Sequence, residues 1–155
     1  NILRAHQFYV PRTITIDQIQ AEVTTAGVAG TLFRLGIYRD DGNSYPGALV
    51  AGSDVGTLVE DATGVKTNTF VTPIILTPGL YWLAHVHSGA PTFRAFNFNQ
   101  LPPVLGHVAT MATTTPYGSG WTVAFTFAAL PDPFTAAGTI LNGFAPPIIL
   151  VRPTG

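Results

Sequence analysis

The chain has 155 residues, the size of one domain, and can bury a hydrophobic core without disulfide bonds. It contains no cysteine, so disulfide bonds and thiolate metal sites are excluded. A net charge of −1, without a cluster of basic residues, argues against nucleic acid and anionic membranes as partners. We therefore expect a single domain over residues 1–155, with neither a membrane-spanning helix nor a signal peptide.

The low proportion of charged residues makes a prediction about the surface. Only 10% of the residues are charged, whereas roughly 25% is usual in soluble domains. Either Thr, Ser, Asn and Gly supply the polar surface, or other subunits cover much of it. We favour the second explanation, because large apolar surfaces mark interfaces. The composition therefore predicts a homo-oligomer.

The sequence is typical of an all-β domain with tight turns, because it combines 16 Gly and 13 Pro with many Thr, Val, Ile and Phe residues. Residues 5–10 form the first expected strand, which Pro11 ends. The run 13–25 follows and contains no Gly or Pro that would interrupt a strand. Its apolar residues change parity between Ile16 and Ile19, which predicts a bulge in a strand. A helix is the competing interpretation, and the β-branched residues of the run disfavour it.

The next segments continue the pattern of strands and turns. Residues 31–38 alternate cleanly, with Phe33, Leu35 and Ile37 on one face, which predicts a half-buried strand. A polar loop at 39–47 follows. Further strands are expected at residues 48–51, 55–59, 66–72 and 74–76.

The stretch 76–87 predicts the central strand of the fold. Pro78-Gly79 is a turn, and a run of aromatic and aliphatic residues follows it. Tyr81 and Trp82 are adjacent and must face opposite sides of the strand. One of them therefore lies in the core and the other on the second face, and if that face is also covered, its cover is another sheet layer or a neighbouring subunit.

The rest of the chain is less regular. Residues 92–98 alternate and are expected to form a hairpin with the central strand. Pro102-Pro103 excludes a central strand in the segment 101–116. The remaining elements are a strand at 121–127, a rigid connector at 130–134 and a final strand at 145–152. About nine or ten short strands and no convincing helix predict an antiparallel β-sandwich of jelly-roll type.

Four motifs occur in a familiar order: Tyr9-Val-Pro-Arg-Thr13, Leu35-Gly-Ile-Tyr38, Tyr45-Pro-Gly-Ala-Leu49 and Leu76-Thr-Pro-Gly-Leu-Tyr-Trp-Leu83. Together they resemble the C-terminal β-sandwich modules of phage tail-fibre and minor tail proteins, over about residues 5 to 100. The motifs are structural rather than catalytic, and similar motifs occur in carbohydrate-binding domains. The resemblance implies a trimeric module that is exposed on the virion and binds a receptor.

Two histidines of the central strand form a candidate metal site. His85 and His87 are two residues apart on a strand and therefore share a face. Two imidazoles can supply half of a zinc site, with His6 or His107 and a carboxylate as further ligands. We favour the alternative that they line a packed face or a subunit interface without metal, and we expect no cofactor.

Other chemistry has weaker support in the sequence. The loop 40–43 offers oxygen ligands for calcium, but Asp-Gly and Gly-Asn pairs are more typical of hairpin turns. The acidic residues lie mostly in predicted turns, and no G-x-S-x-G motif exists. We therefore do not expect an enzyme.

Exposed aromatic rings beside polar groups would suit the binding of sugars. The alternative for Trp121 is a place in the core, because this residue begins an alternating apolar strand. The candidate ligand-binding residues are Tyr45, Tyr117, Trp121, Asn97 and Asn99, with Gln100 next to them.

These observations predict a phage virion structural protein. We expect a trimeric tail-fibre or fibre-tip domain that contacts other virion proteins and adheres to a glycan or receptor on the bacterial surface. The alternatives are a capsid decoration or head-fibre protein, which binds neighbours in the particle, and a carbohydrate-binding module of a secreted enzyme.

Overall fold

The computed structural model describes residues 1–97 and 118–154, and all the regular elements in this part of the chain are strands. The strands are β1 (Ile2–Val10), β2 (Ile14–Thr25), β3 (Leu32–Asp40), β4 (Pro46–Leu49), β5 (Leu58–Val59), β6 (Gly64–Leu76), β7 (Gly79–His87), β8 (Thr92–Phe93), β9 (Gly120–Ala124), β10 (Thr139–Ile140) and β11 (Ile149–Pro153). The expectation of an all-β chain is confirmed.

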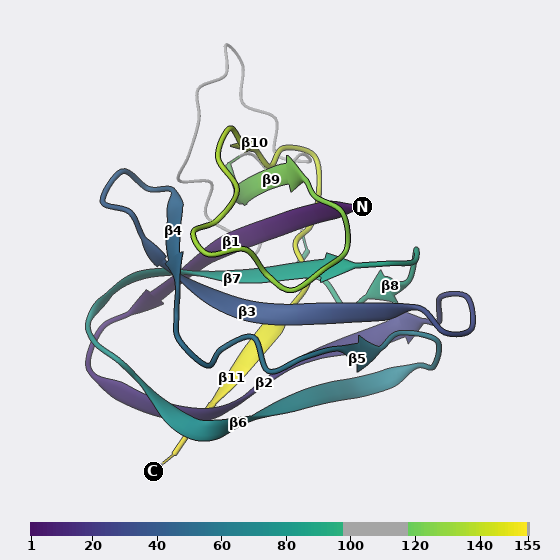
Figure 1. The fold of residues 1–155 in the computed structure, drawn as a ribbon, viewed down its shortest axis with the longest axis horizontal. Helices are drawn as coiled ribbons and strands as arrows, with labels where there is room; N and C mark the ends of the chain where they lie inside the picture. Colours follow the sequence, from purple (N-terminus) through teal and green to yellow (C-terminus); the bar gives the residue numbers. More distant parts are fainter. Residues whose placement is uncertain (98–117, 155) are drawn as a thin grey trace.

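Two antiparallel sheets pack against each other to form a sandwich (Figure 1). One sheet has seven strands in the order β10-β9-β1-β7-β3-β4, and β5 also pairs with β3. The other has four strands in the order β11-β2-β6, and β8 also pairs with β2. The predicted antiparallel β-sandwich is therefore confirmed.

Strand β7 is central in the larger sheet, as its sequence predicts. Ala84 of β7 lies opposite Ala5 of β1 on one side and opposite Gly36 of β3 on the other. Both edges of β7 are therefore occupied, and the predicted hairpin between this strand and residues 92–98 is wrong. Strand β8 instead crosses to the four-stranded sheet and pairs with β2.

The bulge predicted in the run 13–25 is confirmed. The register between β2 and β6 shifts between Ile16 and Gln18. Ile16 and Ile19 have opposite parity, yet both are fully buried in the core between the sheets. Opposite β6 the extra residues are 70–73 of β6, which face the single residue Asp17, whereas opposite β11 the extra residue is Asp17 itself. This irregularity turns β2 so that apolar side chains on both sides of the shift face inward.

The outer face of the seven-stranded sheet is covered by the chain itself. Tyr81 packs in the core between the sheets, whereas Trp82 packs in a second cluster on the outer face. Leu130 and Phe134, from the segment 125–138 between β9 and β10, close this second cluster. Among the described residues, the cover of this cluster is therefore the segment 125–138 of the same chain and not a further sheet layer, which the sequence did not predict.

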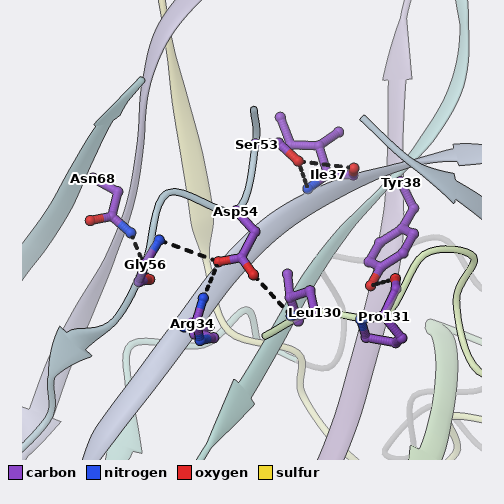
Figure 2. A network of polar contacts seen from close by, with 9 residues as sticks. All are labelled: Arg34, Ile37, Tyr38, Ser53, Asp54, Gly56, Asn68, Leu130 and Pro131. Atoms are coloured by element: carbon purple, nitrogen blue, oxygen red, sulfur yellow. Dashed lines mark hydrogen bonds and ion pairs between the residues drawn. The ribbon is translucent and has the colours of Figure 1, made fainter. Parts of the chain in front are cut away.

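Polar contacts attach this covering segment to the sheet (Figure 2). The Asp54 carboxylate pairs with the Arg34 guanidinium at 2.7 Å and accepts a hydrogen bond from the Leu130 N–H at 2.9 Å. The Tyr38 hydroxyl donates a hydrogen bond to the Pro131 carbonyl at 2.8 Å. These contacts hold the segment 125–138 in place, so that it buries the outer face of the sheet.

Candidate ligand pocket

Strands β1 and β7 bring three basic side chains to the inner face of the larger sheet. Arg4 lies directly opposite His85, and His6 lies opposite Leu83. Leu83 belongs to the core between the sheets, and side chains two apart on a strand share a face, so Arg4, His6 and His85 point inward as well. Leu3 and Ala5, of the other parity, pack in the outer cluster.

A pocket of about 470 Å³ opens beside these residues. Strands β1 and β7 contribute Arg4, His85 and His87, while the segments 91–95 and 141–147 contribute the apolar part of the lining. Backbone contacts join these two segments, because the Phe96 N–H donates to the Pro146 carbonyl at 3.2 Å. The volume is within the range of about 300–1,000 Å³ that is usual for small-molecule sites.

Two histidines on this face, His6 and His85, are buried and neutral at pH 7. His85 is 3% exposed, and its Nδ1 has no hydrogen-bond partner. Burial lowers the pKa of His85 well below its ordinary value, and electrostatic interactions with His6, Arg4 and His87 lower it further. Burial alone lowers the pKa of His6 to about 4. A neutral imidazole has one donor and one acceptor, but the unpartnered Nδ1 of His85 is itself buried and not open to the pocket.

Arg4 is a half-buried cation without a counter-charge. Its Nε has no hydrogen-bond partner, and its guanidinium lies 5.2 Å from the centre of the Phe144 ring. Burial lowers the pKa of Arg4, but an arginine keeps its charge at any physiological pH. None of the eight Asp and Glu side chains of the protein, all of which the structure describes, lines the pocket.

The acidic side chains are instead engaged elsewhere in the fold. Asp17, Glu22 and Asp54 form ion pairs with arginines outside the pocket. The other five accept hydrogen bonds from the following N–H groups: Asp40 from Gly42 and Trp82, Asp41 from Asn43, Glu60 from Gly89, Asp61 from Gly30, and Asp132 from Leu49. The carboxylates of the loop 40–43, considered above for calcium, thus support the turn and the Trp82 indole.

The histidine pair has the orientation that the sequence predicts. His85 and His87 stack almost parallel, with ring centroids 6.3 Å apart. His87 Nδ1 lies 2.7 Å from the Gly89 carbonyl oxygen. Within residues 1–97 and 118–154, no group of three or more His, Asp or Glu residues could hold a metal ion. His107, one of the proposed further ligands, lies outside the described residues.

Two of the predicted sugar-binding residues are brought together, but as partners of each other. Tyr45 and Trp121 pack edge to face, with ring centroids 4.7 Å apart. The Tyr45 hydroxyl donates to the Thr135 carbonyl at 2.6 Å, and the Trp121 indole N–H donates to the Ser44 carbonyl at 2.8 Å. Both rings also pack against the outer cluster, so these two side chains contribute to the fold.

The other predicted sugar-binding residues do not join this pair. Asn97 is exposed at the end of the described N-terminal part. Tyr117, Asn99 and Gln100 lie outside the described residues. The role of this group in glycan binding stays a prediction.

The pocket contains residues that the sequence did not single out. Arg4, Phe93 and Phe144 come from three distant parts of the chain. Arg4 carried one usable signal, since it alternates with His6 on a strand whose other residues, apart from Gln7, are apolar or aromatic. The two phenylalanines carried none, because nothing local distinguishes them from core residues.

Comparisons with known proteins leave the pocket as the main guide to function. No protein-family model matches the sequence, and neither the curated proteins nor the solved structures provide a match. Among the described residues there is no helix of the length and hydrophobicity that crossing a membrane requires.

Proposed function

We propose that this chain is a binding domain of a phage virion. In this proposal it is a trimeric tail-fibre or fibre-tip domain that attaches the particle to a glycan or receptor on the bacterial surface. The observation that carries the binding role is the pocket of about 470 Å³, which the charged Arg4 and the imidazoles of His85 and His87 line together with apolar side chains. A preformed concave site with a mainly apolar lining and a few polar groups is typical of small-ligand recognition.

The proposal of a virion protein draws on the motifs described above, which resemble those of tail-fibre and minor tail proteins, and on the low charge. Only 10% of the residues are charged, as suits a chain that is partly covered by its neighbours. The β-sandwich is compatible with this assignment, although many unrelated functions share such folds.

The acidic residues support binding rather than hydrolysis. A glycosidase needs two carboxylates that flank the bond to be broken. All eight acidic side chains have partners in turns, backbone contacts or ion pairs, and none lines the pocket. We therefore propose that the domain is not an enzyme.

A structural role in the particle is the second candidate. Strand β6 is at the end of the order β11-β2-β6, and Val71 and Ile75 on this strand are 95% and 61% exposed. An exposed strand with apolar side chains can pair with another chain. This feature favours a capsid decoration or head-fibre protein that binds its neighbours.

Two measurements test the proposal. Light scattering should give the mass of a trimer, and the labelled protein should bind host cells or a bacterial glycan array. A monomer would count against both virion roles and favour a carbohydrate-binding module. A trimer that binds neither cells nor glycans would eliminate adhesion and favour the structural role.

A further inference from the structure

We infer that the pocket between β7 and the segments 91–95 and 141–147 binds a carboxylate attached to a ring, with Arg4 as its ionic partner. The inference rests on the proposed binding function and names the class of ligand. It assigns a specific role to Arg4, His85 and the apolar wall of the pocket.

The charge of the ligand follows from the environment of Arg4. Arg34, Arg94 and Arg152 each have a carboxylate at salt-bridge distance. Arg4 is more buried than Arg94 and Arg152, yet no acidic side chain pairs with it in the described part of the chain. The segment 98–117 contains no Asp or Glu that could supply one. Because a buried charge is costly unless it is paired, an anion that enters the pocket gains a strong interaction.

The lining limits that charge to a single one. Arg4 is the one arginine or lysine among the lining residues, and His85 stays neutral at pH 7 because burial lowers its pKa. The pocket thus offers the full positive charge of Arg4 within a largely apolar lining. A monoanionic carboxylate matches this set better than a phosphate, which carries about two negative charges at neutral pH.

The apolar wall accounts for the ring. Phe93 and Phe144 contribute aromatic surface to the pocket, and Pro146 and Pro147 contribute flat aliphatic surface. Such surfaces stack against sugar rings and aromatic rings alike. A uronic acid and an aromatic acid therefore share the chemistry that the pocket recognises, and experiment must distinguish them.

The first test uses the unmodified full chain and three probes. Glucuronate, its uncharged amide glucuronamide, and benzoate are titrated by calorimetry at pH 7. We expect at least one of the two acids to bind about 10- to 100-fold more tightly than the amide, as is usual for a charge-assisted hydrogen bond. If neither acid binds, or if the amide binds as tightly as the preferred acid, the inference is overturned. Preference for glucuronate would identify a sugar acid as the ligand, and preference for benzoate an aromatic acid.

The second test assigns the binding to Arg4. Arg4→Met removes the charge and retains the apolar stem, so the affinity for the preferred acid should fall about 10- to 100-fold. Arg12→Met removes the same charge from an exposed turn and should leave the affinity unchanged. An equal loss in both variants would show that only the overall charge matters, which would overturn the inference. If Arg4→Met does not fold, the comparison of acid and amide on the unmodified chain still decides.

Failure of the pocket assignment can be distinguished from failure of the proposed adhesion function. If the acid binds but the protein attaches to neither cells nor glycans, the pocket assignment stands and the adhesion role fails. If the protein attaches to cells and excess acid does not compete, adhesion stands. In that case the Arg4→Met variant is tested for attachment to cells. If it attaches as well as the unmodified chain, the assignment of the pocket as the receptor site is overturned.

Discussion

The Asp54 carboxylate lies 2.7 Å from the Arg34 guanidinium and 2.9 Å from the Leu130 N–H, so one side chain joins β3 to the segment that covers the outer face of its sheet. The pair is largely buried, with 20% of the Arg34 side chain and 7% of the Asp54 side chain exposed. The covering segment in turn buries Trp82 and Tyr38. This contact therefore supports a large part of the outer cluster.

Asp54→Ala should lower the free energy of unfolding by about 3–5 kcal/mol, because it leaves the buried Arg34 unpaired and the Leu130 N–H without an acceptor. Chemical denaturation measures the change. Asp17→Ala is the matched control, since its partner Arg152 is 58% exposed, and a surface pair contributes about 0–1 kcal/mol. Similar losses in the two variants would contradict the prediction.

The Tyr45 hydroxyl also attaches the covering segment, because it donates to the Thr135 carbonyl at 2.6 Å and accepts from the Gly138 N–H at 3.0 Å. Tyr45→Phe removes both hydrogen bonds and retains the ring, and should destabilise the protein by about 1–3 kcal/mol. Tyr9→Phe, at a side chain that is 69% exposed, should change stability by less than about 0.5 kcal/mol. A stable Tyr45→Phe variant with impaired glycan binding would instead favour a direct role in recognition.

Gly120 allows β9 to approach β1. A Cβ atom at this position would collide with the carbonyl oxygen of Ala5, which is backbone and cannot rotate away. Gly120→Ala should therefore cost about 3 kcal/mol or more in thermal or chemical unfolding. Gly52→Ala separates this crowding from backbone strain, because Gly52 has φ of 77° and open space around it. That control should cost about 1–2 kcal/mol, and an equal or larger loss there would contradict the crowding argument.

The buried histidines predict how stability depends on pH. Burial lowers the pKa of His6 from 6.5 to about 4, so between these values the unfolded chain binds a proton that the folded chain does not. The free energy of unfolding should therefore be greatest above pH 6.5 and fall as the pH drops toward 4, by about 3 kcal/mol from His6. His85 acts in the same direction, because its pKa is lowered as well.

Glu60 has the opposite effect on stability. Burial raises the pKa of its carboxyl, so its contribution declines as the pH rises above 4.5. Comparing the unmodified chain with His6→Gln cancels this effect, together with those of the exposed acids. The difference in stability between the two proteins should shrink as the pH falls from 6.5 to 4, as followed by urea denaturation. A constant difference would show that His6 is not buried in its neutral form.

The elements that the sequence predicts best are those with a local cause. The alternation of Phe33, Leu35 and Ile37 requires one buried face, and all three lie in the core between the sheets. The change of parity between Ile16 and Ile19 requires a bulge, and the register shifts there. Each of these inferences depends only on residues within a few positions of one another.

The predictions that needed distant partners were less successful. The sequence could not show that both edges of β7 are already paired, so residues 92–98 were assigned to a hairpin with the wrong sheet. It also assigned the cover of the outer face to another layer or subunit, whereas the segment 125–138 provides it. That segment has no periodicity that would indicate which surface it covers.

The sequence alone determined the all-β class, the central strand and the shared face of His85 and His87, because the two-residue period of a strand is a local property. Only the tertiary structure decided what those histidines face. Pairing of β1 with β7 places Arg4 opposite His85, and the segments 91–95 and 141–147 close the pocket around them. The physical reason is that strand pairing and packing join residues far apart in the chain, and no local pattern records which partners meet.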